Sequence, residues 1–230
     1  MPTLLLTGAN RGIGLGLARA YAGDGWRVIA TCRDPAAARE LSDLAAASAG
    51  RVTVHALDVT DGAAVTALAR QRKGEAIDVL LNNAGVGESG YAFGKTDYTA
   101  WAHTLDANAM GPQRMAEAFA DSVARSAKRT IVGITSLMGS MADNGSGGYV
   151  AYRSSKAALN MVIVTLAVDL APRGITAIAI HPGWVKTDMG GPGAKLSVAQ
   201  SVANMRKIID RATLAESGKF FNHSGEELPW

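Results

Sequence analysis

Short apolar runs alternate along the chain with longer segments in which apolar residues recur at helical spacing. The runs are continuous, as in strands buried on both faces of a parallel sheet, and lie at residues 4–6, 27–32, 52–57, 77–81, 130–135 and 175–180, with a shorter one at 219–221. Helices are expected at 14–21, 35–47, 61–72, 97–127, 149–170 and 198–211. This alternation predicts an α/β fold, a doubly wound parallel sheet of about seven strands with helices on both faces.

Length and composition favour one compact domain, residues 1–230. The chain is 48% hydrophobic, and it has no repeat, low-complexity segment or Pro/Ser-rich linker. Its net charge is +3, with the basic residues scattered, so we expect no nucleic-acid tract. The longest apolar segment, 157–168, is interrupted by Asn160 and Thr165, which indicates a buried helix and no membrane contact.

Cysteine usage and the N-terminus bear on location. Cys32 is the single cysteine, which suits a reducing compartment, and no Cys/His cluster has metal-ligand spacing. The first residues carry too short an apolar run for a signal peptide. We therefore expect a cytoplasmic protein without a metal.

Three glycines lie between the first strand and the first helix, as Gly8-x3-Gly12-x-Gly14. Glycines there allow a tight turn and let the backbone approach a pyrophosphate at the helix N-terminus. The spacing differs from G-x-G-x-x-G, and an ordinary strand-to-helix turn is the alternative. Three glycines in seven residues favour a dinucleotide site, and hence a Rossmann-type sheet.

Tyr152 and Lys156 are four residues apart at the head of a predicted helix, so they share one face. A nearby ammonium favours the phenolate, which would let Tyr152 exchange a proton nearer neutral pH than its free pKa of about 10. Such pairs are common on ordinary helices, so this one gains weight only from the motifs before it.

Four motifs together resemble the short-chain dehydrogenase/reductase family: Thr7-Gly8-x3-Gly12-x-Gly14, Asn82-Asn83-Ala84-Gly85, Tyr152-x3-Lys156 and His181-Pro182-Gly183. They occur in the family's order and span nearly the whole chain. Within the family, residues 147–160 and the Phe-Phe-Asn…Gly-Glu-Glu-Leu-Pro-Trp end look most like the C-factor and Sniffer-type carbonyl reductases.

The resemblance implies a proton relay through Asn108. Because Pro112 has no N–H, the Asn108 carbonyl loses its partner four residues on, and a water held there would reach Lys156. A proline kink without a relay is the alternative.

It also implies a serine that hydrogen-bonds the substrate carbonyl. Ser136 directly follows the fifth strand but lies 16 residues before Tyr152, a few more than is usual; Ser140 lies 12 before it. We prefer Ser136, because the carboxyl end of a strand is rigid and ligands gather there. Tyr149 is followed four residues on by Arg153, which cannot replace the lysine.

The end of the second strand predicts the cofactor. An acidic residue there would accept from the ribose 2′-OH, but this chain has Cys32-Arg33. With Arg11 in the glycine turn, two guanidinium groups suit a 2′-phosphate, so we predict NADP(H), with NAD possible. Solvated arginines are the alternative, and the Pro35 after Asp34 marks that residue as a helix cap.

The remaining cofactor contacts are implied by the resemblance. Asp58 would face the adenine amine, although a strand-end turn explains it equally well. His181 is interpreted as structural. The full predicted set is Gly8, Asn10, Arg11, Gly12, Ile13, Gly14, Arg33, Asp58, Val59, Asn83, Ala84, Gly85, Tyr152, Lys156, Pro182, Gly183, Val185 and Thr187.

The resulting hypothesis is an NADP-dependent oxidoreductase that interconverts a small carbonyl and an alcohol. Ser136 orients the carbonyl, Tyr152 transfers the proton, Lys156 lowers the tyrosine pKa, and Asn108 leads to solvent. The alternative is an NAD(P)-binding signalling or regulatory protein of C-factor type with little turnover; a flavodoxin-like phosphate binder would leave Tyr152 and Lys156 unexplained. Family relatives suggest a homodimer or homotetramer through helices 97–127 and 149–170.

Overall fold

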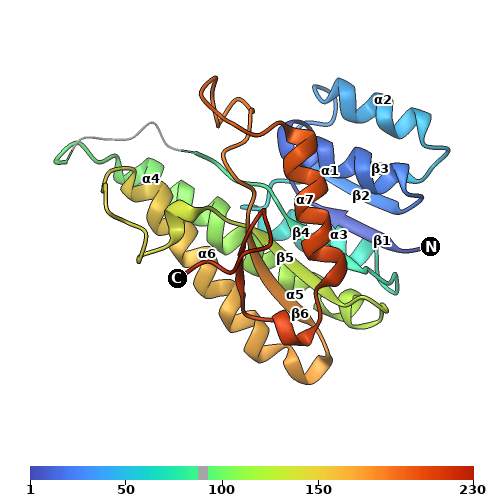
Figure 1. The fold of residues 1–230 in the computed structure, drawn as a ribbon. Coiled ribbons are helices and arrows are strands. Elements are labelled where there is room, and N and C mark those ends of the chain that lie inside the picture. Colours follow the sequence, from blue (N-terminus) through green and yellow to red (C-terminus); the bar gives the residue numbers. More distant parts are fainter. Residues whose placement is uncertain (88–92) are drawn as a thin grey trace.

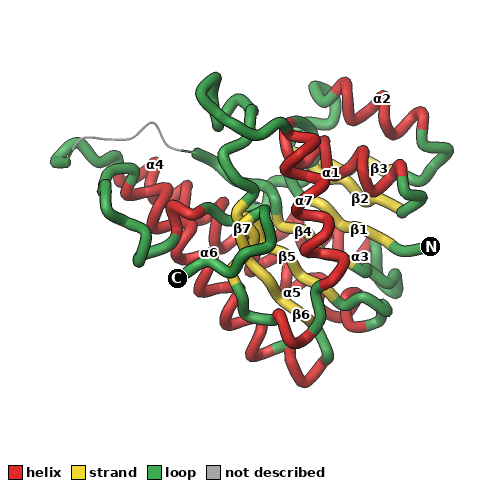
Figure 2. Tube along the Cα trace, in the orientation of Figure 1, coloured by secondary structure: helices red, strands yellow, loops and turns green. Residues whose placement is uncertain are grey.

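The computed structural model describes residues 1–87 and 93–230 and contains a seven-stranded, all-parallel sheet. The strands run in the spatial order β3-β2-β1-β4-β5-β6-β7, and Figure 2 shows them as a yellow layer between red helices. Their bounds are β1 Thr3–Leu6, β2 Arg27–Cys32, β3 Val52–Ala56, β4 Val79–Asn82, β5 Thr130–Ile134, β6 Thr176–His181 and β7 Phe220–Asn222. The predicted doubly wound α/β fold is therefore confirmed.

The helices cover both faces of this sheet, with α1 and α7 side by side on one face and α5 and α6 on the other (Figure 1). Their bounds are α1 Gly12–Gly23, α2 Arg39–Ala47, α3 Gly62–Gln71, α4 Tyr98–Leu105, α5 Gly111–Ala124, α6 Val150–Asp169 and α7 Val198–Arg211. Short 3₁₀ turns occupy Leu137–Gly139, Ala171–Arg173 and Leu214–Glu216. Within the described ranges no helix is long and apolar enough to cross a bilayer.

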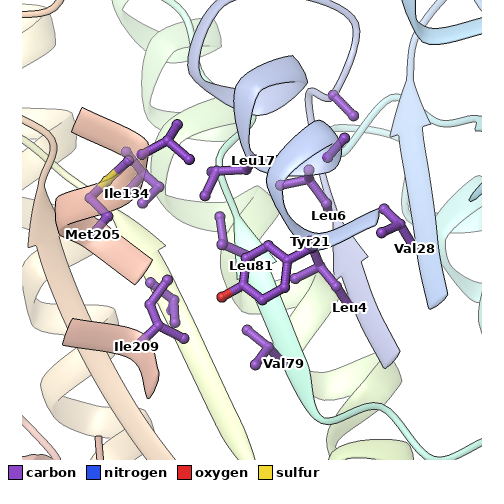
Figure 3. Packing of buried hydrophobic residues seen from close by; sticks show 14 of the residues in the cluster. Leu4, Leu6, Leu17, Tyr21, Val28, Val79, Leu81, Ile134, Met205 and Ile209 are labelled. Carbon is purple, nitrogen blue, oxygen red and sulfur yellow. The ribbon is translucent and has the colours of Figure 1, made fainter. Parts of the chain in front are cut away.

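Alternate side chains of each strand point to opposite faces of the sheet, so a hydrophobic core lies on each face. Leu4 and Leu6 of β1 pack with α1 and α7, whereas Leu5 packs with α3, α5 and α6. Figure 3 shows the first core, where Tyr21 of α1 lies among strand residues, with Met205 of α7 nearby. Burial of each such Leu or Ile stabilises the fold by about 1.5–3 kcal/mol. Because both faces of the strands are buried, the strands appear in the sequence as unbroken apolar runs.

Two segments begin or continue differently from the prediction. The second helix starts at Arg39, not at residue 35, because the Asp34 carboxylate accepts from the amides of Ala36 and Ala37 at 3.0 and 3.2 Å and closes a turn. The expected single helix 97–127 is divided by a π-helical turn, Asp106–Met110. There the amide of Gly111, the residue before Pro112, donates to the carbonyl of Asp106, five residues earlier in the chain.

Strand order reverses between β1 and β4, which are hydrogen-bonded neighbours although β2 and β3 follow β1 in sequence. Crossovers leave β1 and β4 toward opposite faces of the sheet and open a crevice at their carboxyl ends. The glycine turn after β1 and residues 83–85 after β4 both lie at this position.

Candidate active site

The glycine turn is clamped to the segment after β4. The hydroxyl of Thr7 accepts from the amides of Asn83 and Ala84, each at 3.0 Å. The side-chain amide of Asn83 donates to the carbonyls of Thr7 and Gly8, also at 3.0 Å. A Cβ at Gly14 would lie 2.1 Å from the Gly8 carbonyl oxygen, so only glycine lets the first turn of α1 close against this clamp.

A cavity of about 860 Å³ extends from this turn along the carboxyl edge of the sheet. The structure brings most of the predicted cofactor residues to its wall: Gly8, Asn10, Arg11, Gly12, Ile13, Gly14, Arg33, Asp58, Val59, Asn83, Ala84, Gly85, Tyr152, Lys156, Pro182 and Thr187. A helix N-terminus beside closely approaching glycine backbone fits a pyrophosphate.

Two predicted residues do not line the cavity. Val185 is 4% exposed and forms a bridge with Leu196, which fixes the loop after β6 from behind. Gly183 packs against Leu196 and His223. Both therefore support the loop from which Thr187 reaches the wall.

Sequence reasoning missed several wall residues, chiefly Lys186, Asp188 and Met189 of the loop after β6. Asp188 forms an ion pair with Arg11 across the cavity rim. Because these two residues are 177 positions apart, no local pattern signals the pairing. Arg11 therefore has an acidic partner, whereas Arg33 is exposed at the end of β2.

Asp58 is held by its own turn. Its carboxylate accepts from the amide and the hydroxyl of Thr60 at 2.9 and 2.8 Å. These hydrogen bonds lower the pKa of Asp58, and the positive charges of Arg33 and His103 lower it further. The side chain is thus an anion at the cavity wall, between Arg33 and the start of α3.

Tyr152 and Lys156 line the cavity, whereas Ser136, which is 8% exposed, is not among its wall residues. Tyr152 hydrogen-bonds with the Ser136 side chain. Lys156, one turn later on α6, lies with its Nζ 5.7 Å from the centre of the Tyr152 ring and donates to the carbonyl of Ile134 at 2.9 Å. The end of β5 and the first turns of α6 are thereby joined through all three side chains.

Burial dominates the protonation of this cluster. It raises the pKa of Tyr152 above its ordinary value, and the hydrogen bond with Ser136 opposes that rise. Burial also lowers the pKa of Lys156 to about 8. The expected lowering of the tyrosine pKa is therefore wrong for this geometry, because burial is the larger effect and only the hydrogen bond with Ser136 opposes it. At neutral pH Tyr152 is a phenol, able to donate a proton.

The two candidate serines differ in their contacts. Ser140 is 2% exposed, and its hydroxyl donates to the Trp230 carbonyl at 3.0 Å. Ser136 instead contacts Tyr152. Arg153 binds Ser146 and the carbonyl of Gly147, at 2.9 and 3.3 Å, so it braces the glycine-rich loop.

Asn108 lies behind the cavity wall and is fully buried. Its amide oxygen accepts from the Val86 N–H at 2.8 Å, and its amide nitrogen donates to the Val86 carbonyl and to Ser155, both at 2.9 Å. The side chain thus ties the segment after β4 to α6. A water relay at its carbonyl remains a prediction.

Comparison with known proteins agrees with this geometry. Residues 2–195 match the family model described as short chain dehydrogenase. The chain is 46% identical to C-signal of Myxococcus xanthus over 154 residues, which are 67% of this chain and 93% of that protein.

The solved structures that are similar over the full length include two carbonyl reductases. The carbonyl reductase Sniffer of D. melanogaster has a TM-score of 0.95 at 33% identity, covering 100% of both chains. An NADPH-bound carbonyl reductase from chicken fatty liver has a TM-score of 0.93 at 33% identity, covering 100% of this chain and 99% of the other. With the family match extending over most of the sequence, this chain belongs to the short-chain dehydrogenase/reductase family of oxidoreductases.

Proposed function

We propose that the protein is an NADP(H)-dependent oxidoreductase that interconverts a carbonyl compound and an alcohol. The observation that carries the proposal is the Ser136–Tyr152 hydrogen bond, with Lys156 one helical turn away, at the wall of a cavity that begins at the glycine turn. A bound nicotinamide would supply or accept the hydride.

Cofactor binding is assigned to two parts of the cavity wall. The N-terminus of α1 and the glycine turn would hold the pyrophosphate, and Asn83 to Gly85 would lie along it. Arg33 would bind the 2′-phosphate. Support for NADP(H) over NAD comes from the lack of an acid at Cys32-Arg33 and from the NADPH-bound carbonyl reductase of similar structure.

Proton transfer is assigned to Tyr152. Its raised pKa keeps the phenol protonated at neutral pH, which suits donation to the oxygen of a carbonyl undergoing reduction. Ser136 would orient that oxygen, and Lys156 would stabilise the phenolate that remains. Asn108 would hold the wall behind them through Val86 and Ser155.

Tyr152→Phe tests this assignment. Removing the phenolic hydroxyl should lower kcat for NADPH-dependent reduction by about 10²–10⁴, the usual contribution of a general acid, and should leave NADPH binding within about threefold. Tyr149→Phe is the matched control, since Tyr149 is 47% exposed and only three residues earlier. Undiminished turnover in Tyr152→Phe would refute the mechanism.

A second candidate function is a dinucleotide-binding signalling protein. The 46% identity to a protein named C-signal favours it. An NADPH-oxidation assay over a panel of aldehydes and ketones separates the two candidates. Tight cofactor binding without turnover of any panel member would favour signalling.

We also propose a homodimer or homotetramer formed through the α4–α5 and α6 helices. Met161 and Val168 are 64% and 69% exposed on α6, which leaves apolar surface for a second copy. Light scattering that gives the mass of a single chain would reject this proposal.

A cytoplasmic location is the last part of the proposal. Its support is Cys32, a free and buried thiol. Recovery of the native protein from outside the cytoplasm in cell fractionation would contradict it.

A further inference from the structure

Three polar side chains recur at four-residue intervals along α6: Tyr152, Lys156 and Asn160. This spacing puts them on one face of the helix, in three successive turns. The first two belong to the proposed reaction. Asn160 is 4% exposed and is not assigned to that reaction. Burial of a side-chain amide destabilises a fold unless the amide forms hydrogen bonds, so its partners indicate why it is there.

Both ends of the Asn160 amide bind the segment that contains Ser136. The amide oxygen accepts from the Thr135 hydroxyl at 2.7 Å. The amide nitrogen donates to the Gly139 carbonyl at 3.3 Å. Thr135 directly precedes Ser136, and Gly139 ends the 3₁₀ turn that follows it. One side chain therefore holds both flanks of the serine.

The held segment lies directly on α6. A Cβ at Gly139 would come within 2.8 Å of the carbonyl carbon and the Cβ of Lys156, so this turn rests on the backbone that carries the lysine. Within the turn, the Ser136 hydroxyl accepts from the Met138 amide at 3.2 Å, and the Gly139 amide donates to the Ser136 carbonyl at 2.8 Å. The direction of the hydroxyl thus depends on where the turn is held.

We propose that Asn160 is a positioning residue for the proposed carbonyl reduction. By binding Thr135 and Gly139 from α6, it fixes Ser136 relative to Tyr152 and Lys156; this inference rests on the proposed function. A carboxamide suits the role because it accepts and donates at once, whereas a leucine of similar size does neither. Displacing a reacting group by about 1 Å costs roughly 10² in rate.

Asn160→Leu tests the proposal, with Leu166→Ala as control. Leu166 is a 5% exposed core residue further along α6, so its loss weakens packing without touching residues 135–139. In Asn160→Leu, amide hydrogen exchange at Gly139 and Ser140 should rise by roughly tenfold, and kcat should fall by roughly 10–100-fold while the Kd for NADPH stays within about threefold. The control should lose stability but keep local exchange and kcat.

Thr135→Val provides a second arm that leaves Asn160 in place. It removes the hydroxyl partner at nearly constant volume, so it should reproduce most of the kcat loss. Combined with Asn160→Leu it should add little, because both changes break the same hydrogen bond between Thr135 and Asn160.

Unchanged exchange at Gly139 and Ser140 in Asn160→Leu overturns the proposal, as does an unchanged kcat in either variant. A wild-type protein that reduces no carbonyl rejects the proposed function instead. The exchange comparison then still decides for or against Asn160 as the residue that holds the turn.

Discussion

The buried ammonium of Lys156 makes the stability of this protein depend on pH in a direction opposite to that of an ordinary paired lysine. In the folded chain its pKa lies at about 8, below the ordinary value of 10.5, because burial removes hydration from the charged form. Between these values the unfolded chain binds the proton more tightly, so stability rises with pH. The penalty is fully present below about pH 8 and disappears as pH approaches 10.5.

The magnitude follows from linkage. Between pH 7 and pH 10 the difference in proton binding contributes roughly 2.5 kcal/mol to the free energy of unfolding, at about 1.4 kcal/mol per pH unit. Lys156→Met removes the titrating group while keeping a side chain of similar length. Wild type should therefore gain roughly 2.5 kcal/mol relative to Lys156→Met over this interval, in urea unfolding followed by circular dichroism without added cofactor.

Subtracting the free energy of unfolding of Lys156→Met from that of wild type cancels the contributions of the other groups, which titrate in both proteins. Lys207→Met is the control, since Lys207 is exposed on α7 and its removal should change stability equally at both pH values. The free energy of unfolding of wild type minus that of Lys156→Met should therefore increase from pH 7 to pH 10. If this difference stays constant or decreases, the folded chain does not lower the pKa of Lys156, and the reasoning is refuted.

Two further predictions concern the cofactor and the serine. Arg33→Ala should weaken NADPH binding by at least about tenfold and NADH binding by less than about threefold, because only the former has a phosphate for the guanidinium; equal losses in a fluorescence titration would reject the role of Arg33. Ser136→Ala should lower kcat for carbonyl reduction by about 10², whereas Ser140→Ala should keep kcat within about threefold and cost about 1 kcal/mol of stability by releasing Trp230; the reverse order would make Ser140 the active serine.

Where sequence reasoning succeeded, the signals were local. β2 spans Arg27–Cys32 and α7 spans Val198–Arg211, as predicted, because continuous apolar runs and helical periodicity report burial directly. The helix α3 begins after Asp61, whose carboxylate accepts from the amides of Ala63 and Ala64 at 2.9 and 3.0 Å. A capping side chain next to the residues it caps is visible in sequence.

Where it failed, the deciding contact was distant or competed with the local one. Asp34 resembled a helix cap, yet its carboxylate closes a turn and α2 starts at Arg39. The ion pair between Arg11 and Asp188 joins segments far apart in sequence, so no local pattern predicts it, and the phosphate contact of Arg11 stays a prediction. The protonation of Tyr152 depended on how deeply the fold buries it, which residue spacing alone does not specify.

Burial keeps the proposed proton donor, Tyr152, protonated, and burial of the neighbouring Lys156 destabilises the fold. The same loss of hydration raises the pKa of Tyr152 and lowers that of Lys156, so each group is pushed toward its neutral form. At neutral pH the phenol still holds its proton, and Lys156, with a pKa of about 8, is still largely an ammonium that can stabilise negative charge on the tyrosine oxygen. A more exposed pair would be easier to fold, but solvent would screen the ammonium, and the phenolate left after proton donation would gain less from it. Burial of Tyr152 and Lys156 on one face of α6 thus lowers the stability of the fold and at the same time favours the proposed proton transfer.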